Sequence, residues 1–167
     1  MTSSSPLPEG PSQKRASESA TEMVQVVLPN DANPLGYILG GTVMHLIDIA
    51  GAIASFRHAR SRVVTAAVDD LVFLHPIKVG DLIVLQARVT CTFGTSLEVQ
   101  VDVFSEEALT GMRQRTSRAF LTFVAIDEHG GRVTVPPLLV ETPDDERVCA
   151  EAHARREQRL KRRAEAR

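Results

Sequence analysis

Asp48 is the residue whose type and surroundings most suggest chemistry. It lies in the segment 43–51, which is mostly apolar and whose large side chains recur with near-helical spacing. A carboxylate in such a place is costly to bury unless it is paired or hydrogen-bonded. Beside a cleft, a desolvated carboxylate can serve acyl transfer as a general base or as a nucleophile. The alternative is an ordinary helix residue that faces solvent or a lysine.

Two glycines, Gly40 and Gly41, stand where this helix is expected to begin. The first N–H groups of a helix have no partner within it and lie at the positive end of its dipole. They could therefore stabilise the oxyanion that forms when a carbonyl is attacked, although a tight turn and a helix start are enough to explain the pair taken alone. Gly41 and Asp48 are about two helical turns apart, roughly 10 Å. Because one carbonyl cannot reach that far, groups that act on it together are better supplied by different subunits.

Three further positions carry polar groups that could take part. The amide of Asn33 could hold a water or orient a reacting oxygen, and its alternative is an ordinary turn residue. His45 could share one side of the helix with Asp48 as an acid–base pair, although a histidine within an apolar helix is more often structural. Asp69 and Asp70 are neighbours on a predicted strand, so their side chains point to opposite faces and cannot serve one site.

The elements that must position these residues follow from the periodicity. The segment 41–60 is the one convincing long helix in the body of the chain, and its many small residues suit burial against a sheet. Strands are predicted at 23–28 and 63–73, in the alternating segments 83–91 and 97–103, at 113–126, and at 132–135 after a turn. A strongly curved antiparallel sheet wrapped round one helix fits this order. The open edge of such a sheet favours pairing with a second copy.

Composition divides the chain into three parts. Residues 1–22 are rich in Ser, Pro, Glu and Lys, which predicts a disordered tail. Residues 23–142 form the predicted domain. Residues 143–167 are charged, and their mixed signs indicate a solvated C-terminal helix. A second interpretation has the basic face of this helix contacting a ligand phosphate or a neighbouring subunit.

Several function classes are disfavoured by the same sequence. A net charge of −2, 4% aromatic residues and no Trp argue against nucleic acid as a partner. No apolar run is long enough to span a membrane, and the first residues lack a secretory signal. Dinucleotide, Walker and Gly-x-Ser-x-Gly motifs are absent, as is a zinc ligand set. The two cysteines, Cys91 and Cys149, have no metal-like spacing, so we expect no metal and reduced thiols in a cytoplasm.

Several stretches together resemble the cytosolic acyl-CoA thioester hydrolase family of hotdog proteins, which includes brain acyl-CoA hydrolase and single-domain bacterial thioesterases. The likeness covers nearly all of residues 24–160, and it is specific in combination. The matching stretches are 33–36, 40–48, 50–52, 57–58, 64–69, 73–77, 80–81, 95–96 and 135–138.

The resemblance implies an α+β hotdog fold, with a curved antiparallel sheet of five to six strands around one long central helix, plus a C-terminal helix. It implies homodimers with two sites at their interface, further assembled as a trimer of dimers. Each site would take Asn33 from one subunit and Asp48 from the other, with Gly40 and Gly41 polarising the thioester carbonyl. Asp48 would activate water or attack directly, and the two routes remain open.

The implied substrate is a fatty acyl-CoA, which is hydrolysed to a free fatty acid and coenzyme A. Coenzyme A would lie along the subunit boundary near Arg57, Gly94, Thr95 and Ser96, and no separate cofactor is expected. One alternative is a hotdog 3-hydroxyacyl-thioester dehydratase or hydratase, although the usual His-Phe-Pro-Gly run is absent. The other is a non-catalytic acyl-CoA-binding protein. The acyl chain length is left open.

Overall fold

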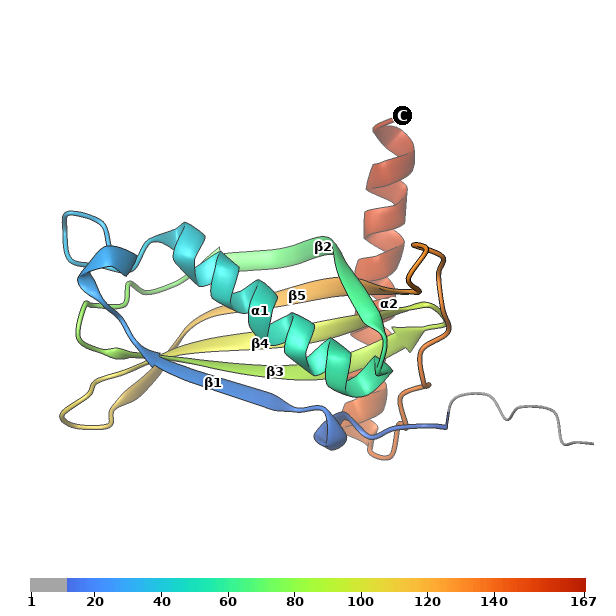
Figure 1. Ribbon diagram of the computed structural model, residues 1–167, viewed down its shortest axis with the longest axis horizontal. Helices are drawn as coiled ribbons and strands as arrows, with labels where there is room; N and C mark the ends of the chain where they lie inside the picture. Colours follow the sequence, from blue (N-terminus) through green and yellow to red (C-terminus); the bar gives the residue numbers. More distant parts are fainter. Residues whose placement is uncertain (1–11) are drawn as a thin grey trace, which may run out of the picture.

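Five antiparallel strands form one sheet, and a long helix lies across one of its faces (Figure 1). The computed structural model describes residues 12–167. The strands lie in the order β1-β3-β4-β5-β2, so β1 and β2 are the two edges. The elements are η1 (Ala16–Glu18), β1 (Thr21–Val26), η2 (Pro29–Asp31), α1 (Gly40–Ala59), β2 (Arg62–Phe73), β3 (Leu82–Phe93), β4 (Ser96–Glu106), β5 (Arg113–Ile126) and α2 (Pro143–Glu165). The predicted hotdog architecture is confirmed, with the lower of the two expected strand numbers.

Small residues let α1 lie close to the sheet. Ala50 and Ala54 are fully buried, and a Cβ added at Gly51 would stand only 3.0 Å from the ring of Phe123. Larger apolar side chains of α1, among them Ile47, complete the core with the inward-facing residues of the strands. The predicted burial of this helix against the sheet is therefore confirmed.

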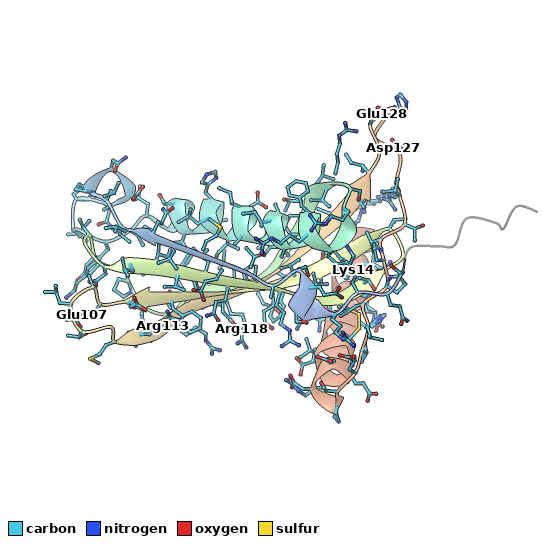
Figure 2. All side chains as sticks on the ribbon, turned by 60° about the horizontal axis from the view of Figure 1, so that its bottom comes forward. Lys14, Glu107, Arg113, Arg118, Asp127 and Glu128 are labelled. Atoms are coloured by element: carbon cyan, nitrogen blue, oxygen red, sulfur yellow. A yellow bond between two sulfur atoms is a disulfide. The ribbon has the colours of Figure 1, made fainter. Side chains whose placement is uncertain are left out.

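The strands behave as their alternation predicts. In β4 the inward residues Leu97, Val99, Val101 and Val103 are fully buried in the core cluster under α1. Outward residues carry polar groups, and Arg118 of β5 lies on this outer face, where it pairs with Asp102 of β4 (Figure 2). Alternation of this kind is typical of an antiparallel sheet with one face on the core.

The predicted strand at 132–135 is wrong. After the turn that ends β5, the chain makes an isolated bridge between Ile126 and Arg132. Val133 donates its N–H to the carbonyl of Ala125, and Val135 donates to that of Gly94. Pro136 and Pro137 follow, and a proline cannot donate to a ladder. The apolar residues of this segment pack on the core without forming a strand.

The predicted disorder of residues 1–22 is wrong for residues 14–22, while residues 1–11 lie outside the described part. Lys14 donates its backbone N–H to Pro137 and its Nζ to the carbonyl of His58, at 3.0 and 2.9 Å. Ser19 is fully buried and β1 begins at Thr21. Residues 14–22 are held mainly by hydrogen bonds, and the buried residues among them are polar. Their polar composition therefore did not indicate that they are ordered.

The C-terminal helix α2 starts where the sequence predicts. Thr142 caps it by accepting the N–H of Asp145, whose carboxylate accepts the N–H of Thr142 in return. The N–H of Glu141 also bonds this carboxylate and is the largest of the contacts that lower the pKa of Asp145. Such reciprocal capping fixes the point at which the chain turns into the helix.

One face of α2 is packed, so the prediction of a solvated helix is wrong for that face. The helix crosses the strands on the face opposite α1 (Figures 1 and 2). Arg155 forms two hydrogen bonds with Glu98, a side chain only 1% exposed, and Arg159 pairs with Asp69 at 2.7 Å. Two of the charged residues that suggested a solvated helix, Arg155 and Arg159, instead bind acidic residues on the outer face of the sheet.

Cys91 and Cys149 are joined as a disulfide, which corrects the prediction of two reduced thiols. The alternation of β3 would place Cys91 on the inner face with Val89. The β3–β4 register shifts between Val89 and Cys91, so Cys91 pairs with Glu98 and shares the outer face with α2. A one-residue register change moves a side chain to the other face of a sheet.

No helix within residues 12–167 is both long and apolar enough to cross a membrane.

His58, near the end of α1, makes the stability of the fold depend on pH. Its ring is fully buried, with Nε2 at 2.7 Å from the carbonyl of Pro136, while Nδ1 has no partner among the described residues. Burial lowers the pKa of His58 below its ordinary value of 6.5, and the Lys14 ammonium acts in the same direction. The neutral ring is therefore the form that the fold accommodates.

We expect the contribution of His58 to the free energy of unfolding to be constant above pH 6.5. As the pH falls below 6.5, this free energy should decrease. Below its ordinary pKa of 6.5 the histidine of the unfolded chain takes up a proton that the folded chain resists. One such group lowers stability by at most about 1.4 kcal/mol per pH unit. Urea unfolding between pH 5 and 8 measures the slope, and His58→Gln should flatten it. An unchanged slope in that variant would assign the effect to other groups.

Candidate active site

Asp48 faces a cleft of about 370 Å³ between α1 and β2. Its side chain is half-buried, and its Oδ1 accepts a hydrogen bond of 2.6 Å from the hydroxyl of Thr65 on β2. Gly41, His45 and Leu121 also line this cleft. A carboxylate held by a hydroxyl at the wall of a partly apolar cleft is suited to accept a proton or to attack a carbonyl.

The start of α1 leaves backbone donors without a partner among residues 12–167. The first hydrogen bond within the helix joins the N–H of Val43 to the carbonyl of Leu39 at 3.1 Å, and Leu39 provides no side-chain cap. A Cβ added at Gly41 would meet no atom within 4 Å, so the space beside this residue is open. Unpaired N–H groups beside an open cleft can bind a developing oxyanion.

The two glycines have different surroundings. Gly41 shares the cleft with Asp48, whereas Gly40 lines a neighbouring hollow, where a Cβ added to it would stand 3.6 Å from the ring of Phe73. The structure therefore brings Gly41 and Asp48 to one cleft of the same chain, at positions two turns apart on α1.

Asn33 lies in the loop before α1, outside the residues that line the Asp48 cleft. Its side-chain oxygen accepts the N–H groups of Leu35 and Tyr37 at 3.0 and 3.2 Å. These bonds fix the plane of the amide and direct its NH₂ group away from the turn. Within one chain, then, Asn33 and Asp48 are not brought together.

Thr65 is the residue at this site that sequence reasoning missed. A threonine on a strand is ordinary in sequence, and only the packing of β2 beside α1 shows that its hydroxyl reaches Asp48. His45 lines the same cleft, but the hydrogen-bond partner of the Asp48 carboxylate among the described residues is Thr65. The geometry therefore favours a hydroxyl-supported carboxylate over a His45–Asp48 pair.

The residues predicted to contact coenzyme A lie elsewhere. Gly94 and Thr95 form the β3–β4 turn, with Gly94 at a φ of +72°, and Ser96 begins β4. The guanidinium of Arg57 donates to the carbonyl of Ala20 and to Thr21, each at 3.1 Å. None of these residues lines the Asp48 cleft.

Two arginines that the sequence did not single out lie between α1 and β2. Arg60 caps the C-terminus of α1 in the left-handed conformation, and Arg62 begins β2. With Phe56 they line an open hollow of about 670 Å³ beside the end of β5. A guanidinium pair next to an exposed aromatic ring is a suitable surface for a phosphate or a heterocycle.

The β2 edge of the sheet is apolar and uncovered. Val64, Val68, Val72 and Phe73 of β2 are 46–57% exposed, and Met44 of α1 is 49% exposed. A strand at a sheet edge also presents unpaired backbone groups. This edge flanks the Asp48 cleft, to which Thr65 and Val68 belong.

Comparison with known proteins agrees with this geometry. Residues 35–111 match the model of the Thioesterase superfamily. An acyl-CoA thioester hydrolase of Bacillus subtilis is 37% identical over 82% of this chain and 80% of its own length. The human cytosolic acyl coenzyme A thioester hydrolase is 31% identical over 87% of this chain, which spans only 39% of that larger protein.

Two solved structures are similar over nearly the whole chain. A hexameric acyl-CoA thioesterase without ligand has a TM-score of 0.86, with 42% identity over 92% of this chain and 98% of its own. An acyl-CoA hydrolase of Staphylococcus aureus, solved with butyryl coenzyme A and coenzyme A, has a TM-score of 0.84, with 34% identity over 92% and 94% of the chains.

The Staphylococcus aureus enzyme has also been solved with single alanine substitutions. They replace an asparagine, an aspartate fifteen positions later, and a threonine seventeen positions after that. Asn33, Asp48 and Thr65 have the same two spacings in this chain. By sequence and by fold, the chain belongs to the acyl-CoA thioester hydrolases of the thioesterase superfamily.

Proposed function

We propose that the chain hydrolyses fatty acyl-CoA to a free fatty acid and coenzyme A, at sites formed between two of its copies. The observation that carries this proposal is the Asp48 carboxylate, which is held by Thr65 in a cleft that also contains the open helix start at Gly41. The matched spacing of Asn33, Asp48 and Thr65 in a relative solved with butyryl coenzyme A supports the same substrate class.

In this proposal the N–H groups at Gly40 and Gly41 of one copy bind the thioester oxygen and take up its developing charge, and Asp48 comes from the other copy. On the general-base route, Asp48 removes a proton from water as the water oxygen bonds to the carbonyl carbon. The tetrahedral intermediate then collapses, the C–S bond breaks, and the coenzyme A sulfur takes the proton from Asp48. On the nucleophilic route, Asp48 itself bonds to the carbon and the C–S bond breaks, so that coenzyme A leaves as a thiolate that takes a proton from solvent. Water then hydrolyses the resulting anhydride, which releases the fatty acid and restores the Asp48 carboxylate.

Asn33 of the partner subunit supplies the third polar group. Its oxygen is used within its own loop, so its NH₂ group is the part that can orient water or the thioester. Because Asn33 does not line the cleft of its own chain, two chains are needed to complete a site.

The β2 edge, with its exposed valines, is the surface proposed to join the two copies. Pairing there satisfies the free backbone groups of β2 and covers apolar side chains on both copies. We extend the proposal to a trimer of dimers, since a similar structure is that of a hexameric acyl-CoA thioesterase. A cytoplasmic location is proposed from the human relative named as cytosolic.

Coenzyme A is placed in this proposal along the boundary between the copies, near Arg57 and the turn at Gly94, Thr95 and Ser96. Arg60 and Arg62 are added as further cations that could bind its phosphates. No cofactor beyond the coenzyme A of the substrate is needed for this chemistry.

Co-expression of two inactive variants, Asn33→Ala and Asp48→Ala, tests whether the site is shared. Random pairing of the two variants makes half of the dimers mixed. If each site takes one residue from each copy, every mixed dimer holds one intact site. Release of coenzyme A from acyl-CoA, followed with a thiol reagent, should recover to about one quarter of the wild-type rate. Each variant alone should remain near background.

The matched control co-expresses wild type with a chain that carries both substitutions. A shared site again predicts about one quarter of the wild-type rate, because every mixed dimer then has two broken sites. A site contained in one chain predicts about one half in this control and no recovery in the first mixture. Acyl-CoA binding by the wild type with no thiol release would support the non-catalytic alternative.

A further inference from the structure

The pair Cys91 and Cys149 lies outside the proposed active site and joins two elements that are far apart in sequence. Cys91 belongs to β3 and Cys149 to α2, 58 positions later, with 4.9 Å between their Cα atoms. That separation lies within the range in which two cysteines can be bridged. The bond therefore ties the C-terminal helix to the outer face of the sheet.

Little apolar surface holds α2 in this place. Within the described helix, Val148 and Ala152 are the only buried residues, and both lie close to Cys149 in its first half. Beyond them the contacts come from polar side chains, which include the ion pairs of Arg155 with Glu98 and of Arg159 with Asp69 and the packing of Arg155 on Phe120. A helix docked through so few apolar side chains depends strongly on a covalent link.

The two sulfurs differ in access. Cys91 is 2% exposed, whereas Cys149 is half-buried. His153, one helical turn after Cys149, is exposed, and its ring packs edge-on against Phe93 at 4.9 Å. The histidine and both sulfurs place their donor atoms within 4.8 Å of one another. A small thiol arriving from solvent can thus reach Cys149 beside an imidazole able to exchange protons.

We propose that Cys91 and Cys149 form a reversible redox latch that fixes α2 on the outer face of the sheet when oxidised and releases it when reduced. Disulfides in a cytoplasm are mostly transient and regulatory, so the proposed cytoplasmic location favours reversibility. The latch itself requires no catalytic activity.

Opening and closing follow thiol–disulfide exchange. To open, the thiolate of a small thiol attacks Sγ of Cys149, and Cys91 leaves as a thiolate that takes a proton. A second small thiol then attacks the mixed disulfide, which frees Cys149 and forms the oxidised small molecule. To close, the thiolate of Cys149 attacks a small disulfide, and Cys91 displaces the remaining thiol as it loses its own proton to the imidazole or solvent.

When the disulfide holds α2 in place, Arg159 of this helix forms an ion pair with Asp69 on the edge strand β2. Asp69, the partner of Arg159, lies on β2 four residues after Thr65, next to the irregularity between Asp69 and Val72. Release of α2 therefore removes a support from the strand that holds Thr65 against Asp48. The effect on α2 is the primary consequence, and any effect on catalysis is secondary.

The test compares full-length protein treated with oxidised glutathione and with dithiothreitol. Alkylation after denaturation, followed by mass spectrometry, should find no free thiol in the first sample and two in the second. Hydrogen exchange of amides in residues 143–165 should be at least about tenfold faster in the reduced sample. Reduction should lower Tm by roughly 5–10 °C.

Cys149→Ser and Cys91→Ser are the matched controls. Both should match the reduced wild type in exchange and Tm, and neither should form the bond between β3 and α2 with oxidised glutathione, although Cys149 of the Cys91→Ser variant takes up one glutathione as a mixed disulfide. Two free thiols after oxidation, or equal exchange of α2 in both redox states, would overturn the latch. Tight binding of one zinc ion per reduced chain, lost in Cys149→Ser, would also overturn it, because the sulfurs would then be metal ligands. Since none of these readouts uses acyl-CoA, they stand apart from the proposed hydrolase activity.

Discussion

Asp48→Asn is expected to lower kcat/KM for acyl-CoA hydrolysis by on the order of 10³, with little change in Tm. Asparagine keeps an oxygen that can accept the hydrogen bond from Thr65, so the cleft should keep its shape. The amide can neither accept a proton from water nor attack a thioester. Both proposed routes therefore fail in this variant. The measurement is thiol release over a panel of acyl-CoAs from short to long, with acyl-CoA binding measured alongside.

Thr65→Val supplies a graded comparison at the same site. It removes one hydrogen bond to the carboxylate while preserving the shape of the side chain, and we expect a loss of about tenfold in kcat with a smaller change in KM. In the double variant with Asp48→Asn, the two losses should not add, because Thr65 acts through the carboxylate. Substantial thiol release by Asp48→Asn would remove Asp48 from its proposed role.

The long helix and the alternating strands could be predicted because their signals are local. Helical spacing over α1 and period-two alternation in β4 each report a buried face directly. The small residues of α1 indicated close packing against the sheet, and Gly51 lies where a Cβ would press on Phe123. Local pattern was therefore enough for the architecture of the sheet and helix.

Features that depend on pairing between distant segments could not be predicted in this way. Composition suggested a disordered tail and a solvated C-terminal helix, but Lys14 bonds to Pro137 and Arg155 to Glu98. A single register shift in β3 turned Cys91 toward α2. Nothing within either segment indicates these partners, because each depends on how two distant parts of the chain meet.

The candidate site divides in the same manner. Asp48 and Gly41 could be singled out because a carboxylate and open glycines are unusual in an apolar helix. Thr65 could not, since its role arises only from the packing of β2 on α1. Asn33 could be identified as a polar loop residue. Its position outside the cleft of its own chain could not be predicted, because that position depends on how the loop and α1 are arranged in space.

Arg155→Ala should have the largest effect on stability of any single charge removal at α2. Arg155 and Glu98 have side chains 13% and 1% exposed, joined by bonds of 2.8 and 3.0 Å, and Thr90 also donates to the carboxylate. The guanidinium also lies 3.6 Å over the ring of Phe120. Removal of one partner leaves a buried carboxylate without its counter-charge. We expect a loss of about 3 kcal/mol in the free energy of unfolding, or roughly 6–12 °C in Tm.

Urea unfolding of the oxidised protein measures this loss, because the disulfide then keeps α2 docked with Arg155 beside Glu98. Glu98→Gln combined with Arg155→Ala should recover part of the stability, because a neutral amide is cheaper to bury than an unpaired carboxylate. Lys161→Ala is the matched control, since its pair with Glu157 is exposed on the same helix and should contribute nothing measurable. If Arg155→Ala unfolds like Lys161→Ala, the ion pair with Glu98 does not hold α2, and docking of this helix must rest on its other contacts, among them Val148, Ala152, the disulfide and the pair of Arg159 with Asp69.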